Sequence, residues 1–162
     1  MKMKEKNGEH PLGDAGQLIL FGLFVVIWIL DSFILHQSTF LTGIIPLGIR
    51  LIILGAALAC AFYLFKSGHV VVSGDQRATK VISNGAFRYV RHPLYLGSIL
   101  IYFGMTVSTA SLFCLILLVA IVVFYNYIAN FEEKLLEVKF GEAYVAYQNS
   151  TGKWVPHLSR RG

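Results

Sequence analysis

The stretch LYLGSILIYFGMTVSTASLFCLILLVAIVVFYNYIA, residues 94–129, decides the fold. It contains two apolar runs, 94–107 and 112–129, which are separated by the short polar turn 108–111. A helix needs roughly 20 mostly apolar residues to span the hydrocarbon core of a bilayer, so the second run is long enough and the first is short. Pro93 directly precedes the first run, where it suits the first turn of a helix. The stretch therefore predicts a helical hairpin in a membrane.

Two further apolar stretches precede the hairpin, at about 17–35 and 44–65, and each is long enough to span a bilayer. Each also contains one charge, Asp31 in the first and Arg50 in the second. Charges inside a membrane usually pair, so we expect Arg50 to pair with Asp31 or to extend to a surface. The alternative is that Arg50 faces the hairpin. Lysines precede the first stretch as in a signal peptide, but no small-residue cleavage site follows it. We interpret both stretches as membrane spans.

The composition agrees with a membrane protein. Of the 162 residues, 56% are apolar and only 14% are charged, whereas soluble domains are about 25% charged. The formal net charge of +5 does not indicate nucleic-acid binding, which needs a polar chain with a basic face. The lipid bilayer is the expected partner. The two cysteines cannot form a disulfide framework or a four-ligand zinc site, and no two histidines have metal-ligand spacing. We therefore predict no metal.

We expect one all-α integral membrane domain with about four transmembrane helices. Its parts are a polar N-terminal tail (1–16), two N-terminal spans (17–65), a loop (66–93), the hairpin (94–129) and a cytoplasmic amphipathic tail (130–162). Lysine and arginine are concentrated in the first, third and last parts and are absent from the turns. Because cytoplasmic loops are rich in these residues, this pattern predicts that both termini are cytoplasmic. We expect the plasma membrane of a prokaryote.

The segment NGAFRYVRHPLYLG, residues 84–97, leads into the hairpin. Binding of lipid phosphates by its two arginines, with Pro93 starting a helix, would explain part of this segment. That interpretation leaves His92, Tyr95 and Gly97 without a role. The free N–H groups and the positive dipole end at the start of a helix suit an anion. The segment is therefore a candidate binding site.

The segment 130–147 follows the second run of the hairpin. Its apolar and aromatic residues repeat at three- and four-residue spacing, which is typical of an amphipathic helix on a membrane surface, and Gly141 would end or kink that helix. The segment also contains the adjacent carboxylates Glu132 and Glu133. Carboxylates near a membrane are costly to desolvate, and a buried pair usually binds a cation. The residues alone leave open whether the two glutamates form a solvated face or a cation site.

The two segments together carry a resemblance to a known family. Arg91-His92-Pro93-Leu94-Tyr95-Leu96-Gly97 resembles the R-H-P-x-Y-x-G motif of the integral-membrane methyltransferases, a group that includes isoprenylcysteine carboxyl methyltransferase and the phospholipid N-methyltransferases. A second part of the chain is similar to the ending of that family, E-E-x-x-L-x-x-x-F-G-x-x-Y-x-x-Y. The matching residues here are Glu132-Glu133, Leu136, Phe140-Gly141, Tyr144 and Tyr147, followed by Pro156. The resemblance covers about 75–158 and keeps the order of motif, hairpin and double glutamate.

The resemblance implies S-adenosylmethionine as cofactor, bound in a cytoplasm-facing pocket between hairpin and tail. It also implies a lipophilic small-molecule or lipid acceptor with a carboxylate, thiol or amine. The candidate cofactor-binding residues are Arg91, His92, Pro93, Tyr95, Leu96, Gly97, Glu133, Tyr144 and Tyr147. Glu132 and Glu133 are the candidate catalytic residues, since either would pair with the cofactor's ammonium or take the proton of an amine acceptor. Tyr144 and Tyr147 would pack on adenosine or dock the tail, and Gly97 would let cofactor or helix approach closely.

One stretch departs from the prenylcysteine enzymes, which place an arginine about one turn before the double glutamate. Residues 126–130 contain none, which disfavours a carboxylate acceptor. Asn126 or Asn130 would instead hydrogen-bond a neutral or thiol acceptor, and we assign Asn126 to substrate positioning. Two alternatives stay open. One is an NADPH-dependent membrane reductase related to the sterol reductases, and the other is a non-enzymatic membrane protein that retains the fold. The oligomeric state and the acceptor also stay open.

Overall fold

The computed structural model describes residues 13–72 and 80–157, and all regular elements in these ranges are helices. In chain order they are α2 (Gly13–Ile29), the π-helix η1 (Leu30–Leu35), the 3-10 helix η2 (Phe40–Gly43), α3 (Leu47–Val72), the 3-10 helix η4 (Gly85–Arg88), α4 (Pro93–Thr109), α5 (Leu112–Phe140) and α6 (Glu142–Ser150). The predicted all-α fold is therefore confirmed.

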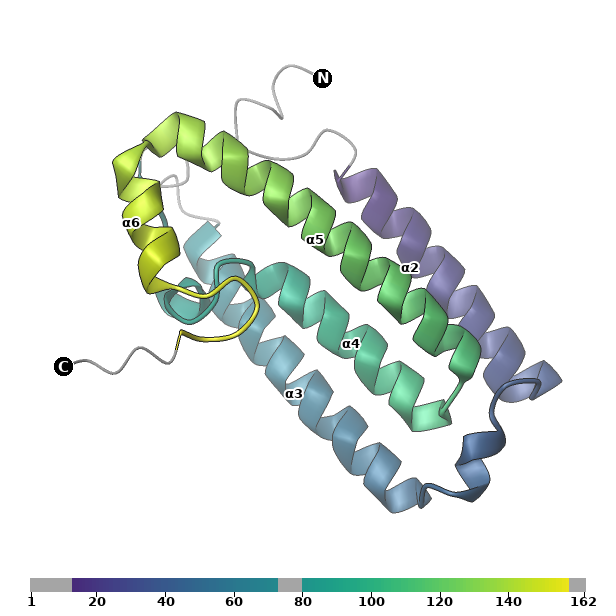
Figure 1. The fold of residues 1–162 in the computed structure, drawn as a ribbon. Helices are drawn as coiled ribbons and strands as arrows, with labels where there is room; N and C mark the ends of the chain where they lie inside the picture. Colours follow the sequence, from purple (N-terminus) through teal and green to yellow (C-terminus); the bar gives the residue numbers. More distant parts are fainter. Residues whose placement is uncertain (1–12, 73–79, 158–162) are drawn as a thin grey trace.

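The four long helices lie side by side, with α4 between α3 and α5 and with α2 against α5 (Figure 1). The α2–α3 and α4–α5 connections meet at one end of this bundle. The segment before α4 and the short helix α6 meet at the other end (Figure 1), which we call the α6 end. The chain order thus brings the two motifs of the sequence to the same end of the molecule.

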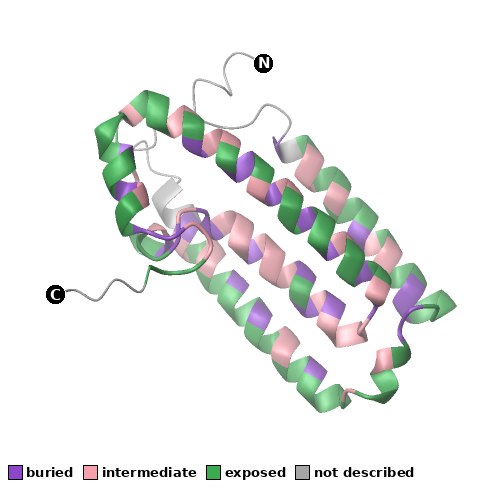
Figure 2. Ribbon diagram, viewed as in Figure 1, coloured by how far each residue is buried: buried purple, intermediate pink, exposed green. Residues whose placement is uncertain are grey.

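Within the described residues, three helical segments are long and apolar enough to cross a membrane: Ala15–Leu35, Leu47–Gly68 and Leu112–Phe140. Helix α4 is apolar but has 17 residues, a length of about 25 Å against a hydrocarbon core of about 30 Å. Many residues along α2, α3 and α5 are exposed (Figure 2), and the exposed residues include many large apolar ones. An apolar outer surface of this extent is typical of contact with lipid.

Two glycines let α4 pack closely on α3. A Cβ atom added at Gly97 would lie 3.2 Å from the Phe65 ring, and one added at Gly104 would lie 3.1 Å from the Ala57 Cβ. Small residues allow membrane helices this close approach. The sequence left open whether Gly97 admits a cofactor or a helix, and the structure places it against a helix.

The structure places two boundaries differently from the sequence expectation. Helix α3 continues beyond 65 to Val72, and α5 continues from the apolar run through both glutamates to Phe140 as one helix. Gly141 then ends α5 with a positive φ of 56°, a backbone conformation that glycine adopts without strain. The predicted effect of Gly141 is confirmed, and the tail begins on the same helix that spans the membrane.

The expected pairing of Asp31 with Arg50 is wrong. The buried Asp31 carboxylate accepts hydrogen bonds from the Ser38 N–H at 3.0 Å and from the hydroxyls of Ser38 and Ser111, each at 2.5 Å. Arg50 instead donates to the carbonyl oxygens of Ile45 at 3.1 Å and Ser108 at 2.7 Å. Serines in the turns satisfy the acid. The base is satisfied by one carbonyl just before α3 and by one near the C-terminal end of α4, where the helix dipole favours a positive charge.

We expect Asp31→Ala to destabilise the fold, because it removes the acceptor of three hydrogen bonds at the turns that join the helices. A buried donor left unsatisfied costs about 1–3 kcal/mol. The measurement is the free energy of unfolding of the purified protein in detergent. Glu142→Ala, which removes an exposed carboxylate on α6, is the control. Equal stability of the two variants would contradict this account.

Candidate functional site

The candidate site forms where the segment before α4 meets the segment after α6. The Arg91 N–H donates to the Gly152 carbonyl at 2.9 Å, beside an isolated parallel bridge between Val90 and Gly152. Pro93 then begins α4, consistent with its fixed φ. This short backbone pairing fixes the end of the tail against the R-H-P motif.

Glu133 is a buried carboxylate with two partners. Its Oε1 accepts from Arg91 Nε at 3.0 Å and lies 2.9 Å from His92 Nε2. Arg91 also donates through one terminal nitrogen to the carbonyls of Gln148 at 3.1 Å and Thr151 at 2.6 Å. A carboxylate removed from water needs a cation and hydrogen bonds. Glu133 is therefore a paired internal charge and not part of a solvated helix face.

Glu132 lies on the other side of His92. The Tyr95 hydroxyl donates to Glu132 Oε1 at 2.5 Å, and His92 Nδ1 is 3.9 Å from Glu132 Oε2. The rings of His92 and Tyr95 stack with 5.7 Å between centroids and 4° between planes. The imidazole thus lies between the two adjacent carboxylates. We call Arg91, His92, Tyr95, Glu132 and Glu133 the carboxylate layer.

Burial lowers the pKa of His92, and the neighbouring charges of Lys153 and Arg91 act in the same direction, while Glu133 opposes them. The imidazole is therefore neutral at pH 7. Because Nε2 faces a carboxylate oxygen, the proton of the neutral ring lies on Nε2. His92 then acts as a hydrogen-bond donor that orients Glu133.

A cavity lies beside the carboxylate layer. Polar side chains and aromatic rings both line it: Lys80, Arg91, His92 and Glu132 on the polar side, and Phe87, Phe140, Tyr144 and Tyr147 on the aromatic side, together with Val81, Ile82 and Leu136. The cavity therefore offers charges of both signs next to flat apolar surfaces.

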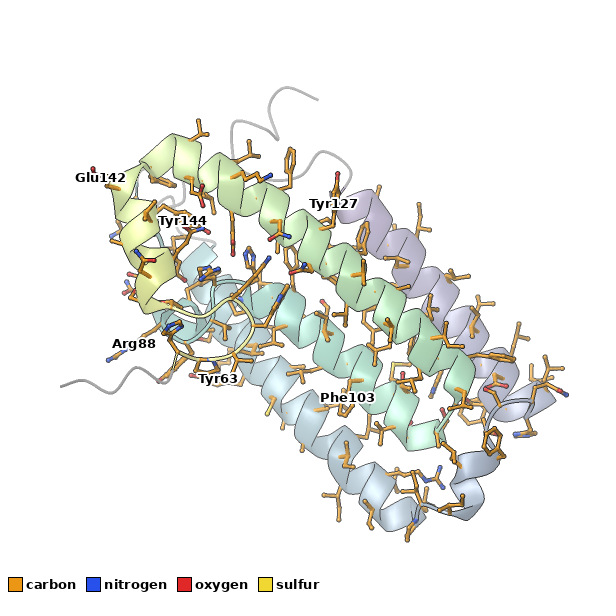
Figure 3. The ribbon with its side chains drawn as sticks, in the orientation of Figure 1. Tyr63, Arg88, Phe103, Tyr127, Glu142 and Tyr144 are labelled. Carbon is orange, nitrogen blue, oxygen red and sulfur yellow. The ribbon has the colours of Figure 1, made fainter. Side chains whose placement is uncertain are left out.

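Tyr144 and Tyr147 line this cavity from α6, and both are buried. Tyr144 lies on the inner side of the corner between α5 and α6, whereas Glu142 lies at its outer edge (Figure 3). The Tyr147 hydroxyl donates to the Phe87 carbonyl at 2.6 Å. Burial raises the pKa of both phenols, so both stay protonated at neutral pH. Tyr147 thus docks the tail, which is one of the two roles considered from the sequence, and it also lines the cavity. Packing of the two tyrosines on adenosine stays a prediction.

The remaining candidates lie outside the cavity lining. Pro93 is buried as the first residue of α4, and the Leu96 N–H donates within the helix to the His92 carbonyl at 3.0 Å. With Gly97 against α3, these residues position the helix start. The carbonyl of Asn126 accepts from Lys153 Nζ at 3.0 Å and from Trp154 Nε1 at 3.3 Å. Their roles toward cofactor or substrate stay predictions.

Sequence reasoning missed Lys80, Lys153 and Trp154. Lys80 precedes the motif segment by a few residues, and it reaches the cavity through the folding of that segment. Lys153 and Trp154 follow Gly152, whose pairing with Val90 brings them to the site. The only signal for this part of the site in the sequence is that a basic residue, Lys153, is next to an aromatic one, Trp154. Such pairs are common at membrane surfaces, so the signal does not single out a site.

Within the described residues, no group of three or more histidine, cysteine or acidic side chains could hold a metal ion. The absence of a metal from the function stays a prediction.

The fold and the site define a helical membrane protein with a polar and aromatic cavity at one end of its bundle. A sequence model of the phospholipid methyltransferase family matches residues 44–143, which are 100 of the 162 residues. The chain belongs to this family of membrane methyltransferases. The match includes both the R-H-P motif and the double glutamate, so the resemblance seen in the sequence is confirmed. A comparison with curated protein sequences gives no match.

We expect Arg91→Ala to loosen the tail and destabilise the fold. It leaves Glu133 buried without its cation and two carbonyls of the tail without their donor, and breaking a buried pair costs about 3–5 kcal/mol. The readouts are the free energy of unfolding and the rate of proteolysis in 141–157. Arg88→Ala removes an exposed arginine three residues earlier and is the control. If both variants resisted proteolysis equally, Arg91 would not hold the tail.

Proposed function

We propose that the protein transfers a methyl group from S-adenosylmethionine to a lipophilic or lipid acceptor at the cytoplasmic face of a membrane. Family membership establishes a membrane methyltransferase, and the cofactor, the acceptor and the face are our proposal. The observation that carries it is the carboxylate layer beside a cavity of mixed charge and aromatic surface.

The side chains that line the cavity fit the chemical groups of the proposed cofactor. Glu132 is a partner for its ammonium group, and Arg91 and Lys80 are partners for its carboxylate. The four aromatic rings offer flat surfaces for adenine and a negative face for a sulfonium. The cavity therefore offers a partner for the ammonium, the carboxylate, the sulfonium and the adenine of this cofactor.

When bound, S-adenosylmethionine supplies a methyl group on a sulfonium, which is already an activated leaving group. The protein's task is therefore to align the acceptor and to exclude water. Tyr144 and Tyr147 cover the cavity from α6 and restrict the access of water. Arg91 and His92 hold Glu133 in place. They thereby fix the carboxylate layer, beside which the reacting groups would lie.

The two glutamates differ in their surroundings, and this suggests different roles. Glu133 is held through one oxygen by Arg91 and His92, so we assign it to positioning. Glu132 lies at the cavity and is oriented by the Tyr95 hydroxyl. An amine acceptor must lose a proton before or during methyl transfer, and Glu132 is the base that we propose for it. A thiolate or carboxylate acceptor would need no base.

The distribution of basic residues supports a cytoplasmic cavity. Lys80, Arg88, Arg91, Lys134 and Lys153 all belong to segments at the α6 end. Cytoplasmic segments carry most lysines and arginines. We therefore propose a multi-pass protein with both termini in the cytoplasm, in the plasma membrane of a prokaryote, with α4 as a short fourth pass.

We expect the purified protein in detergent to bind S-adenosylmethionine, and Glu132→Gln to weaken this binding at least tenfold. A charge-assisted hydrogen bond is worth about 1.5–3 kcal/mol, and the amide removes the charge while keeping the shape. The measurement is equilibrium dialysis with labelled cofactor, and Glu142→Gln on the outer edge of the corner is the control. No binding at millimolar cofactor in a folded sample, or binding of NADPH instead, would refute the proposal.

A further inference from the structure

Four aromatic rings from three parts of the chain meet beside the two glutamates. The centroid of the Trp154 ring lies 5.7 Å from that of His92, and the His92 ring stacks on that of Tyr95. The Tyr95 ring in turn lies 5.2 Å from the ring of Tyr125. Rings at centroid separations of about 4.5–7 Å attract one another. We call Trp154, His92, Tyr95 and Tyr125 the aromatic row.

The two middle members of the row each hold one glutamate. The His92 Nε2–H donates to Glu133 Oε1 at 2.9 Å, and the Tyr95 hydroxyl donates to Glu132 Oε1 at 2.5 Å. A hydrogen bond depends steeply on distance and angle. The direction in which each carboxylate points is therefore linked to the positions of the two rings.

Both ends of the row are anchored on α5. Tyr125 is buried in the core that α2, α4 and α5 share, and Trp154 Nε1 donates to Asn126 Oδ1 at 3.3 Å. Glu132 and Glu133 follow these two neighbouring anchors after seven residues, which is about two turns or 10 Å of the same helix. The row thus starts on one face of α5 and returns to that face at the glutamates.

Lys153 helps to fix the indole of Trp154. Its ammonium lies over the Trp154 ring, 5.6 Å from the centroid, where a cation is attracted to the face of the ring. The same ammonium donates to Asn126 Oδ1 at 3.0 Å and to Asn130 Oδ1 at 2.6 Å. Trp154 is not among the residues that line the cavity. It would therefore affect a molecule in the cavity through the row and not by contact.

We propose that Trp154 is a positioning residue, which orients Glu132 toward the cofactor through the rings of His92 and Tyr95. This inference rests on the proposed function, in which Glu132 binds the ammonium of S-adenosylmethionine. A carboxylate that is already oriented binds more tightly, because less conformational freedom is lost on binding. Asn126 acts through Trp154 and not on the substrate.

A double-mutant cycle on cofactor affinity tests this link. Equilibrium dialysis with labelled S-adenosylmethionine in detergent would compare the parent, Trp154→Leu, Glu132→Gln and the double variant. We expect Trp154→Leu to weaken binding at least fivefold in the parent and less than twofold in the Glu132→Gln background, where the carboxylate that the row orients is absent. A general loosening of the tail would weaken binding by the same factor in both backgrounds, since independent effects add.

The chain offers a matched control. Trp28 also packs against the core, and its Nε1 donates to the Met105 carbonyl at 3.2 Å near the opposite end of the bundle. Trp28→Leu therefore makes the same replacement away from the row, and it should leave cofactor affinity unchanged. The free energy of unfolding in detergent identifies the folded variants.

Two milder variants keep the test valid if Trp154→Leu does not fold. Trp154→Phe keeps a ring beside His92 but lacks the N–H, so its affinity should lie between those of the parent and Trp154→Leu. Asn126→Ala removes the acceptor of that N–H and should weaken binding about threefold. Both effects should fall below twofold in the Glu132→Gln background.

Equal affinity of the parent and the Trp154 variants for S-adenosylmethionine would overturn the inference. Equal losses in the two backgrounds, or a loss of the same size in Trp28→Leu, would overturn it as well. Failure of the proposed function has a different signature, because the parent protein itself would then not bind S-adenosylmethionine.

Discussion

The structure depends on the burial of one carboxylate, that of Glu133. A buried carboxylate is stable only with a cation and hydrogen bonds around it, and Arg91 and His92 supply these through a single oxygen. Arg91 also binds two carbonyls at the end of the tail. One side chain thus joins α5, the start of α4 and the segment after α6. The cavity exists because these three elements are held at fixed distances.

The same contact organises the chemistry that we propose. On one side of the carboxylate layer lies a cavity with charges of both signs and four aromatic rings. Beside Trp154, whose ring lies near that of His92, Lys153 donates to Asn126 and Asn130 where the apolar part of α5 ends. A methyltransferase must keep two substrates apart except at the transferred group. A layer of paired side chains beside the cavity is suited to this requirement.

The sequence predicted the helices and the two motifs because their signals are local. Apolar length predicts spans, Pro93 a helix start, and Gly141 a helix end. The pairing of Asp31 with Arg50 was predicted wrongly, because serines and carbonyls of the turns, which carry no local signal, satisfied both charges. Lys153 and Trp154 were missed for a related reason. The pairing of Val90 with Gly152 and the bonds of Arg91 to the tail bring them to His92. Contacts over about sixty residues of chain have no pattern in the sequence.

The central claim is that Arg91 and Glu133 act as one unit, and a double-mutant cycle tests it most directly. The free energy of unfolding in detergent would be measured for the parent, Arg91→Met, Glu133→Gln and the double variant. If the two side chains form the contact on which the site depends, the double variant will be more stable than the sum of the single losses implies, by about 1–3 kcal/mol. Additive losses within about 0.5 kcal/mol would contradict the account.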